Sequence, residues 1–366
     1  MFLNKSIYPI GIDLSEAHLY AVQLQDHRKG LSVRGLFHQE LEAADGELSL
    51  KEESLSKALK EIPKTPGFSG RRVALHLPFD TLLSFPIRFQ INRESSLEQA
   101  IVQKSKEYLP FPLHQAVMDY ASLEALGPPE EKRYRAMVVA LKKDILDLYL
   151  NLVKQCGFVV ETVDFAFSSL MRVHCYLYGT IDHPLILCHV GEEQSILSAV
   201  NNEGILYQRN ISWGLKPLLR RILGNFELGD DLEKGKVLLS RYGLSYEVQR
   251  SGAKKDEDPS AYDMQRALFQ VITPNIGALV EEIHKIIGYL RSEAPDTSPA
   301  GIHLYGQGAF IRHLDTFIET GVNIPTQLIN PFEQMSKSNG QGDADEFGGA
   351  SFCLALGLAM RKVTWL

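Results

Sequence analysis

The amino-acid sequence carries one strand pattern twice. Residues 11–25 (GIDLSEAHLYAVQLQ) align with residues 187–201 (LCHVGEEQSILSAVN) at one constant offset, and each segment predicts an apolar strand, a short polar turn and a second apolar strand. A third strand follows in each copy, at residues 31–37 and 204–211. The sequence therefore predicts an antiparallel three-stranded unit at the start of each half of the molecule.

Composition agrees with two lobes. A chain of 366 residues, 45% hydrophobic and 23% charged, can bury a sizeable core and predicts two or three domains. Its net charge of -7 argues against nucleic acid as a main partner, and no apolar run of about 18 residues predicts a membrane span. The first residues lack the pattern of a secretion signal. The four scattered cysteines suggest no disulfide framework, so we expect a reduced, cytoplasmic setting.

Between the two strand units, the pattern predicts a small inserted subdomain. Residues 72–150 alternate strands and helices and are predicted to form an α+β insertion. Residues 1–71 and 151–180 would then form the first lobe, and residues 181–366 the second. We expect the apolar helix near the end of the second lobe to be able to pack back on the first.

Several motifs in a fixed order carry a family resemblance: GIDLS, YLPFPLHQAVMDY, HVGEEQSILSAVNNEGILYQRNISWG, LYGQGAFIRHLDTFIE, NPFEQM and LALGLAMRK. This order is similar to that of PilM-type platform proteins of type IV pili, which are relatives of the division protein FtsA. It covers nearly the whole chain. The resemblance implies an actin-like α/β fold with duplicated ribonuclease H-like lobes and an inserted α+β subdomain.

The resemblance also implies ATP and Mg²⁺ in the cleft between the lobes. The positions that match the family's nucleotide site are Asp13, Ser15, Gly191, Gly306 and Gly308. A carboxylate in the turn would order Mg²⁺ and its water, and glycine would let backbone N–H groups approach the phosphates. Gly306 and Gly308 are explained equally well by a tight turn that requires glycine.

The nucleotide motifs depart from the family pattern. Ser15 replaces an expected glycine, and His189 stands where the family has an aspartate. Glu192 and Glu193 follow Gly191, and a carboxylate close to phosphate oxygens would cost about 1 to 4 kcal/mol per charge pair. In the adenine-side motif, Lys236 and Leu239 replace an expected glutamate and lysine. We therefore predict that the chain is no enzyme and has at most weak or vestigial ATP binding.

The resemblance implies a protein partner as well. Family members hold the short cytoplasmic tail of the bitopic membrane protein PilN in a groove beside the insertion. The predicted lining of this groove consists of aromatic and proline side chains: Phe85, Phe89, Tyr108, Pro110 and Phe111. The same side chains could instead fill a core. We predict a scaffold of a pilus or related secretion machine that lies at the inner membrane through its partner.

Other functions remain open from the sequence. An FtsA-like membrane-associated filament protein would carry an amphipathic C-terminal anchor, and an actin-like kinase would need two competent phosphate turns. The pairs His174–Cys175 and Cys188–His189 resemble zinc ligands, although ordinary burial explains them more simply. The sequence also leaves open whether copies of the chain associate.

Overall fold

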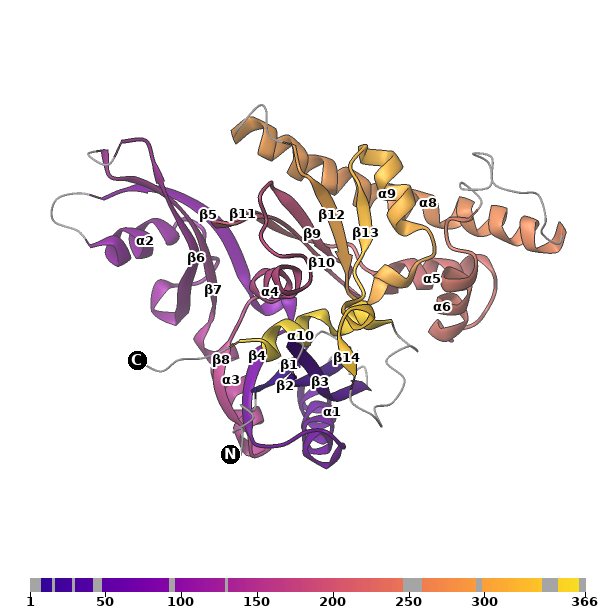
Figure 1. The fold of residues 1–366 in the computed structure, drawn as a ribbon, viewed down its shortest axis with the longest axis horizontal. Coiled ribbons are helices and arrows are strands. Elements are labelled where there is room, and N and C mark those ends of the chain that lie inside the picture. The colour runs from indigo at the N-terminus through magenta and orange to yellow at the C-terminus, as the bar shows by residue number, and fades with distance from the viewer. Residues whose placement is uncertain are drawn as a thin grey trace.

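The structure, a computed structural model, describes residues 8–14, 17–27, 30–41, 48–91, 96–128, 131–245, 259–293, 298–337 and 348–361. Its strands form three sheets (Figure 1). A six-stranded sheet lies in the first lobe, at the bottom of the figure, and a five-stranded sheet lies in the second lobe above it. A three-stranded sheet forms the inserted subdomain at the upper left.

The first-lobe sheet has the order β14-β3-β2-β1-β4-β8. Its strands are β1 (Ile10–Asp13), β2 (His18–His27), β3 (Gly30–Glu40), β4 (Arg72–His76), β8 (Val159–Val163) and β14 (Ser336–Lys337). Strand β1 is antiparallel to β2 and parallel to β4. The helices α1 (Leu48–Glu61) and α3 (Lys143–Gln155) share one apolar core with the sheet, and β1 is buried along its whole length because both of its faces are covered.

The second-lobe sheet repeats this arrangement in the order β11-β10-β9-β12-β13. Its strands are β9 (Leu185–His189), β10 (Ser195–Asn201), β11 (Gly204–Ile211), β12 (Gly301–Tyr305) and β13 (Thr326–Leu328). The helices of this lobe are α5 (Leu215–Asn225), α6 (Leu232–Arg241), α8 (Pro259–Glu293) and α9 (Leu314–Val322). Side chains of α5, α8 and α9 pack with β9, β10 and β12 in one hydrophobic cluster.

The duplication extends to the strand register. Gly11 pairs with Val22 in the first lobe, and Leu187 pairs with Ser198 in the second. Both copies also shift register between the second and third strands, between Gln23 and Leu24 in one and between Ala199 and Val200 in the other. All of these positions correspond under the single offset that relates the two sequence segments. The predicted duplicated hairpin is therefore confirmed, and its two copies also share a β-bulge at corresponding positions.

The inserted subdomain is smaller than predicted. It consists of β5 (Leu83–Gln90), α2 (Leu97–Ser105), β6 (Ala116–Leu126) and β7 (Arg133–Lys142), in the sheet order β5-β7-β6. Ser96 and Gln99 form a capping box that starts α2. The predicted limits, residues 72 and 150, differ from the structure because β4 pairs with β1 and because Val153 of α3 belongs to the first-lobe core.

Two helices join the lobes. These are α4 (Ala166–Tyr178) and α10 (Cys353–Ala359), which pack together beside strands of both sheets in one hydrophobic cluster. A β-carbon on Gly11 would lie 2.0 Å from the Ala355 carbonyl oxygen, so glycine is required where α10 meets β1. The terminal helix thus lies on the first-lobe sheet, and the contact between the lobes is continuous core.

Candidate functional site

The cleft between the lobes is almost filled. The cavity there has a volume of about 10 Å³, measured as the space open to the centre of a water molecule, so it holds about one water. Pockets for ligands commonly measure about 300–1,000 Å³. The lining residues come from both lobes: Asp13, Ala17, Tyr20, Phe79, His189, Gly191, Glu192, Gln307 and Ser351. This closed cleft has no room for a nucleotide.

The carboxylate predicted to order Mg²⁺ is engaged by the protein itself. Asp13 ends β1 and His76 ends the neighbouring β4, which places Asp13 Oδ1 3.1 Å from His76 Nδ1. Both side chains are 1% exposed. His189 ends β9 at the position that corresponds to Asp13, and burial lowers the pKa of His189 to about 4, so this imidazole is neutral at pH 7. Phe79 packs its ring edge against His76 and His189, with ring centroids 4.9 and 5.2 Å away.

The three predicted phosphate-binding glycines donate their amides within the chain. Gly191 N–H donates to Ser195 Oγ at 3.2 Å. Gly306 N–H donates to the Ala350 carbonyl and Gly308 N–H to the Val190 carbonyl, each at 3.0 Å. A β-carbon on Gly308 would lie 2.2 Å from Val190 Cγ1, and Gly306 has a φ of 87°, so both glycines permit close packing of the turns. Ser15 lies outside the described residues.

These observations together test the fit of Mg-ATP. The volume is too small, the first-turn carboxylate is paired with His76, and the glycine amides already have acceptors. The adenine-side positions show the same pattern, since Leu239 is fully buried in the second-lobe core and Lys236 pairs with Glu233 on its own helix. The residues of this cleft do not fit Mg-ATP.

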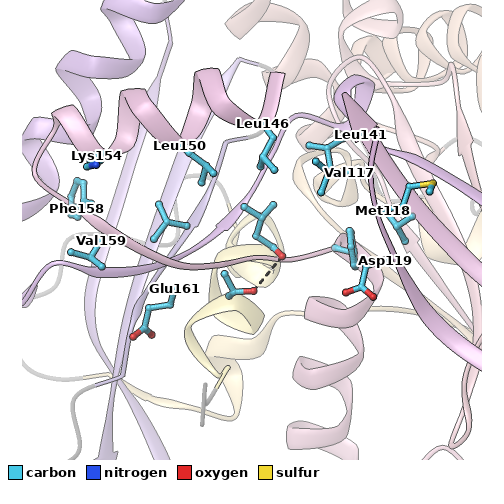
Figure 2. Close-up of a pocket in the computed structure, with 15 residues that line it drawn as sticks. Val117, Met118, Asp119, Leu141, Leu146, Leu150, Lys154, Phe158, Val159 and Glu161 are labelled. Atoms are coloured by element: carbon cyan, nitrogen blue, oxygen red, sulfur yellow. Dashed lines mark hydrogen bonds between the residues drawn. The ribbon is translucent and has the colours of Figure 1, made fainter. Parts of the chain in front are cut away.

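A second cavity is large and open. It measures about 650 Å³ and lies between β6 of the inserted subdomain and α3 and β8 of the first lobe (Figure 2). Most of its lining is apolar, with Val117, Met118, Val139, Leu141, Leu146, Leu150, Phe158, Val159, Val160, Val163 and Phe165. Asp119, Lys154 and Glu161 add charge, and Thr162 completes the lining. We call this cavity the β6–β8 groove.

Two sheet edges flank the β6–β8 groove. Among the described residues, β8 pairs only with β4 and β6 pairs only with β7. An unpaired strand edge presents backbone N–H and C=O groups in a row and can accept a further strand. An apolar groove beside such an edge is the arrangement with which many domains bind an extended peptide.

Comparison with known proteins identifies the family. A family model described as type IV pilus assembly protein PilM matches residues 11–363. The chain belongs to the PilM family. It is also similar to a solved PilM-PilN type IV pilus biogenesis complex, with a TM-score of 0.75 and 20% identity over 96% of this chain and 97% of that chain. The ethanolamine utilization protein EutJ from Carboxydothermus hydrogenoformans gives a TM-score of 0.53 at 11% identity, over 96% and 89%.

Membership of the PilM family and these structural likenesses confirm the predicted family and the predicted actin-like fold. The chain is thus an actin-like type IV pilus assembly protein. Within the part of the chain that the structure describes, no helix has the length and apolar character to cross a membrane.

The five side chains predicted to contact a partner lie outside the β6–β8 groove. Phe85 and Phe89 lie on the face of the inserted sheet that packs against α2, whereas Val139 and Leu141 face the groove. Tyr108 stacks on Phe85 with ring centroids 5.1 Å apart and is 44% exposed. Pro110 is exposed and Phe111 is half-buried beyond the end of α2. The alternation of β5 thus points its aromatic rings toward α2, which covers them.

The histidine–cysteine pairs form no metal centre. No group of three metal-ligating side chains occurs among the described residues. His174 Nδ1 lies 3.1 Å from His303 Nδ1, and Cys188 is fully buried, which raises the pKa of its thiol to about 12. His174, Cys188 and His189 are buried, whereas Cys175 is exposed.

Proposed function

We propose that this chain is a scaffold of type IV pilus assembly that holds the cytoplasmic tail of a PilN-like bitopic membrane protein in the β6–β8 groove, and that it does so without nucleotide. The observation that carries the proposal is an open apolar cavity of about 650 Å³ between two strand edges that no other described strand pairs. The similar PilM-PilN complex supports a PilN-like partner. Through this partner the chain would lie at the inner membrane.

The groove suggests how the tail is held. An extended tail adds a strand to one of the two edges, and alternate side chains enter the apolar space below α3. Cytoplasmic segments next to membrane spans are rich in lysine and arginine. Asp119 is exposed in the lining and provides a carboxylate for such a residue, whereas Glu161 already pairs with Arg72.

Catalysis and nucleotide-driven assembly receive no support from the cleft. A kinase of this fold would need two phosphate turns with available amides, and the second-lobe amides of Gly191, Gly306 and Gly308 bond within the chain. We infer that the nucleotide site is degenerate and that any ATP binding is weak. Calorimetry with millimolar Mg-ATP tests this inference, and a micromolar dissociation constant would contradict it.

A matched pair of substitutions tests the groove. Val159 lines the groove and is 60% exposed, while Val237 lies on α6 of the second lobe and is 57% exposed. Val159→Arg should weaken binding of a synthetic peptide with the sequence of the PilN-like tail by about tenfold, because it places a cation in the path of a basic segment. Val237→Arg should leave the affinity unchanged. Equal affinities of the two variants would contradict the assignment of the groove.

Backbone methylation of the peptide tests strand addition itself. In a paired strand, alternate N–H groups donate to the neighbouring edge and the others point away. N-methylation at one alternating set of peptide positions should therefore abolish binding, whereas methylation of the other set should be tolerated. Equal loss from both sets would leave the groove without a paired strand and would contradict this mode of binding.

A further inference from the structure

A side chain of the second-lobe turn contacts the first lobe across the cleft. Glu192 lies in the second-lobe turn after β9, and His18 begins β2 in the first lobe. His18 Nε2 lies 2.7 Å from Glu192 Oε1, and the side chains are 2% and 11% exposed. Glu192 therefore crosses the cleft and contacts the opposite lobe in an environment with little water.

The surroundings keep Glu192 anionic. Burial raises the pKa of Glu192, but the hydrogen bond and charge of His18, followed by the charges of Lys236 and Lys216, outweigh this effect and leave the pKa below its usual value. Lys216 belongs to α5 and Lys236 to α6, so the charges of two second-lobe helices and the histidine of the first lobe favour the anionic form of one carboxylate.

A second histidine supports the contact from the first lobe. His38 Nε2 on β3 lies 2.9 Å from His18 Nδ1, and His38 also stacks on the buried ring of Tyr20. Burial, with the charges of His18 and Lys236, lowers the pKa of His38 to about 4, so His38 is neutral at pH 7. A neutral His38 has one donor and one acceptor nitrogen, so it can either donate to or accept from His18 Nδ1, and in both cases His18 Nε2–H can donate to Glu192.

The neighbouring acidic residue differs in one decisive respect. Glu193 pairs with Lys216 at 3.0 Å, and both residues belong to the second lobe. Its ion pair therefore does not cross the cleft. Adjacent glutamates in one turn thus offer an internal comparison between a contact that joins the lobes and a contact within one lobe.

We propose that Glu192 is a built-in anion that takes the place of a bound phosphate and holds the two lobes closed without any nucleotide. In a two-lobed fold whose turns face each other, an anion bound by both turns ties the lobes together. Here the chain supplies that anion, and the remaining space of about 10 Å³ excludes an external one. This inference goes beyond the scaffold function and does not depend on which partner occupies the β6–β8 groove.

A distance measurement between the lobes tests the proposal. Spin labels at Lys57→Cys on α1 and Val237→Cys on α6 occupy exposed positions on opposite lobes, in a background in which the exposed Cys175 is changed to serine. The otherwise unchanged chain should give one narrow distance distribution, the same with and without Mg-ATP. Glu192→Ala should lengthen or broaden that distribution by about 2 Å or more, the scale of domain rearrangement.

The controls keep each outcome decisive. Glu193→Ala should retain the narrow distribution, and a thermal melt reports whether each variant is folded. Glu192→Gln, which keeps the side-chain volume but removes the charge, replaces the alanine variant if the latter fails to fold and should also broaden the distribution. A folded Glu192 variant with the same distribution as Glu193→Ala would overturn the proposal, and so would a distribution of the unchanged chain that narrows when Mg-ATP is added.

Discussion

The β6–β8 groove and the interlobe cleft differ in how much space they leave for a ligand. The groove offers about 650 Å³ of mostly apolar space between strand edges that remain unpaired among the described residues. The cleft keeps about 10 Å³, and its glycine amides and the Asp13 carboxylate already bond within the chain. The difference teaches that this chain packs its interlobe cleft as core and leaves its open apolar space beside the inserted subdomain.

The comparison predicts that cleft substitutions cost stability. Phe79 is 3% exposed and packs against His76 and His189 from the two lobes. Phe79→Ala should lower the free energy of unfolding by about 3 to 5 kcal/mol, the usual cost of removing a buried phenyl ring. Urea unfolding measures this loss. A loss below about 1 kcal/mol would show that the cleft is not a packed core.

Acid should weaken the cleft as well. The pKa of His189 is about 4 in the folded chain because of burial, against about 6.5 in an unfolded chain, so the unfolded state binds the proton first as the pH falls. The contribution of His189 to the free energy of unfolding is fully present above about pH 6.5. It falls by on the order of 3 kcal/mol as the pH is lowered toward 4. Urea unfolding at pH 7.5 and pH 4 should show this loss. His189→Gln should reduce the pH dependence, whereas an unchanged dependence would exclude His189 as its source.

Groove substitutions should instead cost affinity. Leu150 of α3 lines the groove, and Leu328 lies on β13, the strand of the second lobe that corresponds to β8. Leu150→Ala should weaken tail binding by about 1 to 3 kcal/mol, the scale of a buried apolar anchor. Leu328→Ala should have no effect, because it lies at the matching edge of the other lobe. Equal losses of tail affinity in the two variants would show that the groove contributes no more to binding than the rest of the surface.

The smallest effect is expected at the aromatic cluster beyond α2. Phe111 is half-buried and lies outside the groove lining. Phe111→Ala should change tail affinity by less than about twofold, as for an ordinary surface substitution. Peptide titration of the folded variant measures the change. A loss of about tenfold would favour the sequence prediction that this cluster contacts the partner.

The sequence predicts the fold because its signals are local and repeated. In each lobe the sequence shows an apolar strand, a polar turn and a second apolar strand. The structure repeats this unit, including a β-bulge at Gln23 in the first lobe and at Ala199 in the second. The sequence also showed that His189 and Glu192 depart from the family's nucleotide motifs. The histidines that contact Asp13 and Glu192, which are His76 and His18, were not visible there, because only the folded chain brings residues so distant in sequence together.

The sequence analysis expected a groove beside the insertion, but the residues that line the β6–β8 groove required knowledge of tertiary contacts. Aromatic side chains in β5 are prominent in the sequence, but α2 covers the face on which they lie. The groove lining is built instead from ordinary aliphatic residues of β6, α3 and β8. The spacing of apolar residues in α3 was a usable signal. It could not show that β8 ends its sheet, since strand order depends on pairing between distant segments.

The most direct test of the account is a titration of the PilN-like tail peptide into the chain with and without millimolar Mg-ATP. An open groove and a closed cleft predict binding to the nucleotide-free chain, with a dissociation constant that Mg-ATP changes by less than about twofold, since a ligand without differential affinity shifts no equilibrium. Tail binding that appears only with Mg-ATP, or that strengthens by about tenfold in its presence, would contradict the claim that this chain recognises its partner without nucleotide.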